Sequence, residues 1–85
     1  MDALDGNAIA GMLNEIFGEE MTTAIGVCAH CGADDRIGAM HVFLRAPGTI
    51  VRCAHCGDVV MAFIEVHNVV SVDLRGLSEL DATAR

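Results

Sequence analysis

Two copies of one five-residue segment constrain this chain more than any other feature. Cys28-Ala29-His30-Cys31-Gly32 recurs as Cys53-Ala54-His55-Cys56-Gly57, and the two copies contain all four cysteines. A Cys-x-x-Cys-Gly segment folds as a tight turn, here called a knuckle, in which both sulfurs face one centre and the glycine accepts a positive φ. Two knuckles supply four thiolates with the tetrahedral geometry of structural Zn²⁺ sites. The sequence therefore predicts one structural zinc ion with the ligands Cys28, Cys31, Cys53 and Cys56.

A bound metal also suits the length of the chain. We expect residues 1–85 to form a single domain, and a domain of this size buries only about 60 to 65 % of its unfolded surface. Such a small core is normally reinforced by a disulfide, a metal or a partner chain. The N-terminal segment has no signal-peptide pattern, so we expect a cytoplasmic protein whose cysteines stay reduced. The longest apolar run, residues 59–64, is too short to span a membrane.

The four cysteines are also compatible with chemistry other than zinc binding. A cysteine-ligated iron centre uses the same ligands and remains an alternative to zinc. A redox-active pair of the thioredoxin kind needs a βαβ pattern, which this sequence lacks. Cysteines buried only as small apolar residues would not be expected to fall into two identical pentapeptides.

An amphipathic helix is predicted for residues 5–18. Asp5 is a suitable N-cap, and Gly18 is a suitable residue for the positive φ that often ends a helix. The helix carries an apolar stripe with the i, i+3, i+4, i+7, i+8 spacing, formed by Ile9, Met12, Leu13, Ile16 and Phe17. The stripe either covers the core of the domain or serves as a docking face for a partner protein or a second copy of the chain.

Strands are predicted in the second half of the chain, where the apolar period changes to two. The expected strands are residues 40–45, 49–52, 59–66 and 69–74, with a type II turn over 46–49 and a tight turn at His67-Asn68. Residues 59–66 are continuously apolar up to Glu65, as in a central strand that is buried on both faces. Residues 75–85 are expected to be a polar tail with at most one helical turn.

These elements predict an α+β fold: an N-terminal helix followed by a three- to four-stranded antiparallel sheet. The two knuckles, the hairpin between them and the strands after them resemble a zinc ribbon over residues 28–74. Residues 1–20, Leu44-Arg45-Ala46-Pro47-Gly48 and Val72-Asp73-Leu74 together resemble a family of small actinobacterial proteins known as a domain of unknown function. That resemblance supports the ribbon and implies no activity.

A second resemblance favours iron. Rubredoxins also use two Cys-x-x-Cys-Gly knuckles and are acidic, which implies electron transfer as an alternative function. Rubredoxin cores are typically packed with Tyr, Trp and Phe, whereas this chain has no Tyr, no Trp and three Phe. The predicted N-terminal helix also departs from that pattern.

The charge of the chain argues against nucleic acid as its main partner. The net charge is −7, there is no lysine, and the five basic side chains are all arginine. Nucleic-acid binders usually carry a dense basic patch. Arg45 and Arg52 flank the predicted hairpin, and phosphate binding by these two residues is the alternative function.

No catalytic motif accompanies the cysteines. His30 and His55 lie inside the knuckles, where a mixed Cys/His site is conceivable, but four thiolates already complete the shell. His41 and His67 are expected at the surface. The sequence therefore predicts a non-enzymatic protein-interaction or regulatory module without a small-molecule substrate, which binds a protein partner or itself through the helix stripe.

Overall fold

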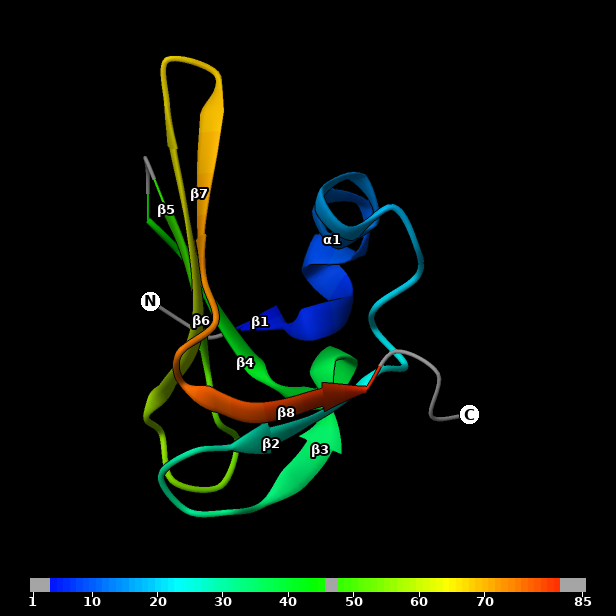
Figure 1. The fold of residues 1–85 in the computed structure, drawn as a ribbon, viewed down its shortest axis with the longest axis vertical. Coiled ribbons are helices and arrows are strands. Elements are labelled where there is room, and N and C mark those ends of the chain that lie inside the picture. Colours follow the sequence, from blue (N-terminus) through cyan, green and yellow to red (C-terminus); the bar gives the residue numbers. More distant parts are fainter. Residues whose placement is uncertain (1–3, 46–47, 82–85) are drawn as a thin grey trace.

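The computed structural model describes residues 4–45 and 48–81, which form one α-helix near the N-terminus and antiparallel strands in two sheets, all but the short β1 following the helix (Figure 1). The first sheet has the order β1-β4-β5-β6-β7, with the strands Leu4–Asp5, His41–Arg45, Gly48–Arg52, Val59–Val66 and Val69–Asp73. The second sheet has the order β3-β2-β8, with the strands Asp34–Arg36, Ile25–Cys28 and Leu77–Asp81. The predicted α+β class is confirmed, but the strands outnumber the three to four expected.

The predicted end of the helix at Gly18 is confirmed, but Asp5 caps a 3-10 turn and the α-helix begins only at Ala10. Asp5 accepts a hydrogen bond from the N–H of Asn7 (3.1 Å), and Gly18 ends the helix with φ 75°. Between them, residues Gly6–Ile9 form a 3-10 turn, η1, and only Ala10–Phe17 are α-helical, as α1. The backbone of Gly6 lies so close to Ile37 that a Cβ there would sit 1.9 Å from the Ile37 carbonyl oxygen. This contact with a second 3-10 turn, η2 (Ile37–Ala39), accompanies the tighter winding.

The helix stripe packs on one face of the five-stranded sheet (Figure 1). Ile9 and Leu13 are buried, and Phe17 meets Phe63 of β6 edge-on, with ring centroids 6.5 Å apart. The other two stripe residues, Met12 and Ile16, are half-buried against the same core. The core consists of Ile9, Leu13, Met21, Ala24, Cys28, Ile37, Met40, Val42, Val51, Cys53, Val60, Met61 and Phe63.

Both predicted hairpins are present. Strands β4 and β5 pair with Phe43 opposite Ile50, and β6 and β7 pair with Phe63 opposite Val72. His67 and Asn68 both have positive φ (52° and 64°), as a two-residue type I′ turn requires. The first two residues of the predicted type II turn, 46 and 47, lie outside the described residues.

Strand β6 is not buried on both faces along its whole length, contrary to prediction. Val60, Met61 and Phe63 are buried, whereas Ile64 and Val66 are 37 % and 51 % exposed. The hairpin of β6 and β7 continues past α1, so no helix or strand of the described residues covers its tip (Figure 1). The continuous apolar run therefore predicted the strand correctly, but the prediction that both faces are buried along its whole length was wrong.

The prediction that residues 75–85 form a polar tail is also wrong for the part that the structure describes. Residues 77–81 form β8, which pairs with β2 and places Gly26 opposite Leu80. Strands β2 and β3 were likewise not predicted. Leu77 lies against Gly26, where a Cβ would come within 3.1 Å of the Leu77 side chain, so the glycine makes room for the leucine. The strands β2, β3 and β8 are short and lack a clear alternation of apolar and polar residues, so their stability comes from pairing with one another.

Within the described residues, every helix falls short of the length and apolar character needed to cross a membrane.

Candidate metal centre

The two knuckles are the turns of two hairpins that belong to different sheets. The first knuckle, residues 28–32, connects β2 to β3 in the three-stranded sheet. The second, residues 53–57, connects β5 to β6 in the five-stranded sheet. Figure 1 shows both turns at the same end of the molecule. A site shared by the knuckles therefore joins the two sheets.

The knuckles have the same backbone geometry. In each, the N–H of the first cysteine donates to the carbonyl oxygen five residues later, at 2.9 and 2.8 Å. The N–H of the glycine donates back to the carbonyl oxygen of the first cysteine, at 2.9 and 3.0 Å. Gly32 and Gly57 have φ of 75° and 82°, as expected from the glycine in each repeat. Identical pentapeptides thus fold as two equivalent halves of one site.

The four sulfur atoms meet between the two turns. The Sγ atoms of Cys28 and Cys56 are 3.6 Å apart, those of Cys31 and Cys53 are 3.7 Å apart, and all four lie within 4.8 Å of one another. A disulfide needs about 2.05 Å, and all four cysteines are free. Zn–S bonds of about 2.3 Å in a tetrahedron place sulfurs about 3.8 Å apart. The cluster therefore has the donor set and the spacing for one four-coordinate metal ion.

Each knuckle contributes one buried and one exposed cysteine. Cys28 and Cys53 are 1 % and 3 % exposed and belong to the apolar core, whereas Cys31 and Cys56 face outward. The N–H of His55 donates to the Cys53 sulfur at 3.3 Å, which is the bond expected to stabilise a thiolate. A metal at this site is therefore anchored directly in the core.

The proton affinities of the thiols show why the cluster suits a cation. Backbone N–H groups of Cys31 and His30 donate to Cys28 and lower its pKa to about 6 despite burial. At Cys56 the N–H of Asp58 also favours the thiolate, but partial desolvation of the sulfur inside the cluster and the neighbouring cysteines raise the pKa to about 12, although the residue as a whole is exposed. Four sulfurs at this spacing cannot all carry charge unless a positive ion lies among them.

The knuckle histidines lie within ion-pair distance of carboxylates on the opposite half of the site. His30 Nδ1 is 3.6 Å from an Asp58 oxygen, and His55 Nε2 is 3.3 Å from an Asp35 oxygen. Both histidines are more than half exposed, and the candidate ligand group in the described chain consists of cysteines alone. Sequence reasoning missed both aspartates, because their partners come from the other knuckle.

Arg52 donates to the carbonyl oxygen of Gly57 at 2.9 Å and lies 5.7 Å from the ring centroid of Phe43. It therefore connects the second knuckle to the sheet. Arg45 is the last residue of β4, and His41 and His67 are exposed, as predicted.

The knuckle glycines provide a first test of this geometry. A Cβ at Gly32 or Gly57 meets no atom within 4 Å, so an alanine there is disfavoured by its positive φ alone. We expect Gly32→Ala and Gly57→Ala each to lower the free energy of unfolding by about 1 to 2 kcal/mol. The corresponding asparagine variants should lose less, because asparagine tolerates this conformation better. Chemical denaturation of the metal-loaded protein measures the difference, and equal losses for alanine and asparagine would contradict an effect of positive φ.

The chain matches a known protein family over its whole length. The model of a family described as "Family of unknown function (DUF6510)" matches residues 1–85. No curated protein and no solved structure matches the chain.

Proposed function

The chain belongs to this family of unknown function, so we propose a function from its own site: a small zinc protein that acts as a non-enzymatic protein-interaction or regulatory module. Its zinc ion is structural and is bound by Cys28, Cys31, Cys53 and Cys56. The observation that carries the proposal is the meeting of four sulfurs from two equivalent knuckles, within 4.8 Å of one another. Each sheet supplies two of them, so the ion fixes the sheets relative to each other.

A structural role is supported by the closed donor set. Four cysteine sulfurs complete the coordination of Zn²⁺, whereas hydrolytic zinc sites keep one position open for water. The buried position of Cys28 and Cys53 ties the ion to the core rather than to an open cleft. The arrangement of two knuckles at the turns of two hairpins also supports the zinc-ribbon assignment.

We prefer zinc over iron for this site because the core of the chain contains few aromatic side chains. Rubredoxin-like centres are expected to be packed with several kinds of aromatic ring, whereas this chain has only three phenylalanines. Two of them, Phe17 and Phe63, pack against each other under the helix. The aliphatic and methionine-rich core suits a structural ion with no redox function.

Metal analysis tests the proposal directly. We expect purified protein to be colourless and to contain about one zinc ion per chain, since d¹⁰ Zn²⁺ has no visible ligand-field transitions. Elemental analysis and an absorption spectrum of the same sample provide the measurement. A red protein with stoichiometric iron would replace this proposal with the rubredoxin-like alternative. Protein without any stoichiometric metal would refute both.

A protein partner fits the charge of the chain better than nucleic acid does. The net charge of −7 becomes more negative when four thiolates bind one Zn²⁺, because the complex carries −2. Arg52 is already engaged with Gly57 and Phe43. Salt-dependent retention on DNA or RNA that persists at about 150 mM salt and is lost in Arg45→Ala or Arg52→Ala would contradict a protein partner.

A further inference from the structure

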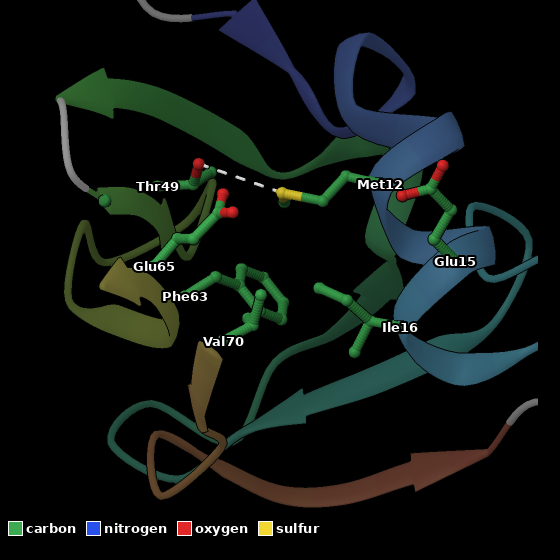
Figure 2. Close-up of a pocket in the computed structure, with 8 residues that line it drawn as sticks. Met12, Glu15, Ile16, Thr49, Phe63, Glu65 and Val70 are labelled. Atoms are coloured by element: carbon green, nitrogen blue, oxygen red, sulfur yellow. Dashed lines mark hydrogen bonds between the residues drawn. The ribbon is translucent and has the colours of Figure 1, made fainter. Parts of the chain in front are cut away.

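A groove lies between the helix and the outer part of the five-stranded sheet. Its volume is about 200 Å³. Figure 2 shows Met12 and Ile16 of α1 on one side and Phe63 and Val70 of the sheet on the other. The Thr49 hydroxyl contacts the Met12 sulfur at 4.0 Å across one end. The four facing side chains are therefore apolar and include one soft thioether, while the groove as a whole exposes polar and apolar surface in about equal shares.

Two carboxylates line the same groove from opposite sides. Glu15 belongs to α1 and Glu65 to β6, and both side chains are exposed (Figure 2). In the part of the chain that the structure describes, neither has a hydrogen-bond or ion-pair partner. Four apolar side chains bordered by two unpaired negative charges complement a ligand with an apolar stem and a positive end. Long cationic side chains have this shape, because they bury their methylenes and keep the charge in water.

We propose that this groove binds the side chain of a lysine on an extended segment of a partner protein, with its methylenes on Met12, Ile16, Phe63 and Val70 and its ammonium group near Glu15 and Glu65. The inference deepens the proposed function, on which it rests, by naming the chemistry of the partner. A second copy of this chain cannot supply the lysine, since the sequence contains none.

The neighbouring sheet edge explains how such a lysine reaches the groove. Strand β7 is the last strand in its sheet, and Val70 of β7 pairs with Glu65 of β6. An extended segment added to β7 forms main-chain hydrogen bonds, and its residue opposite Val70 projects from the same face of the sheet. A lysine opposite Val70 therefore lies beside the groove. It is aligned across the strands with Val70 and, one strand further, with Glu65.

Binding of short peptides to the zinc-loaded, full-length chain tests the inference. The probes are the blocked pentapeptide Thr-Val-Lys-Val-Thr and its analogue with norleucine, which keeps the stem and loses the charge. We expect the lysine peptide to shift the NMR signals of Ile16, Phe63 and Val70 and to bind more tightly than the norleucine peptide. The difference should shrink as salt rises, because exposed ion pairs are screened. Equal affinity of the two peptides at low salt, or no shift at these residues, would overturn the proposal.

Matched glutamine variants separate the groove from general charge effects. Glu65→Gln and Glu15→Gln should each weaken the lysine peptide by up to about fivefold and leave the norleucine peptide unchanged. Glu79→Gln removes the same charge from exposed β8 and should have no effect. An equal loss with Glu79→Gln would overturn the proposal. Zinc content is measured in each sample: intact zinc without lysine binding refutes this inference alone, whereas a folded protein without zinc refutes the proposed function.

Discussion

Removal of the metal is expected to unfold both sheets together. The ion would lie between the turns of β2–β3 and β5–β6. Its loss leaves four close sulfurs without a positive charge among them, with the pKa of Cys28 lowered and the pKa of Cys56 raised. Structural zinc contributes about 10 to 16 kcal/mol in small zinc-finger peptides, against a net stability of about 5 to 15 kcal/mol for a typical domain. A strong chelator should therefore abolish the amide NMR dispersion of residues 25–28 and 40–73.

A pair of variants in one knuckle separates loss of a ligand from a general disturbance of the turn. Cys31→Ser removes an exposed ligand, whereas Ala29→Ser alters a neighbouring exposed side chain and keeps the backbone hydrogen bond to Gly76. We expect the first variant to lose zinc and cooperative unfolding, and the second to keep both. A metal-free protein that retains the dispersion of both sheets would contradict a structural role for the centre.

The second large effect is expected at Gly76, between β7 and β8. A Cβ there would lie 2.1 Å from the Val59 carbonyl oxygen and 2.4 Å from the Val60 Cα, which are backbone atoms of β6. The carbonyl oxygen of Gly76 also accepts from the N–H of Ala29 in the first knuckle, at 2.9 Å. We expect Gly76→Ala to cost about 3 kcal/mol or more, because overpacking against backbone requires the chain to move.

Gly11→Ala is the matched control for this substitution. Gly11 lies in α1 with no atom within 4 Å of its Cβ position, so the same added methyl group should stabilise the helix by about 0.5 to 1 kcal/mol. Chemical denaturation gives both free energies, and amide exchange of residues 77–81 reports whether β8 separates first. A Gly76→Ala variant as stable as the natural chain would show that β8 is not held in this close contact.

Much of the candidate site follows from the sequence, because its ligands lie within short repeated segments. A knuckle is closed by hydrogen bonds over five residues and needs one glycine with positive φ, so each pentapeptide specifies its own half. The cross-pairing of His30 with Asp58 and of His55 with Asp35 depends on how the two halves face each other. Local sequence contains no signal for such a contact.

The fold divides in the same way. The sequence by itself determined the end of the helix at Gly18, its apolar stripe, and the hairpins of β4–β5 and β6–β7, because periodicity and turn residues act over a few positions. Only the tertiary structure decided that residues 77–81 pair with β2, since their stability comes from a partner strand about fifty residues away. It also decided which part of the stripe is buried and which part lines the groove, because the sheet extends beyond the helix and covers only one side of it.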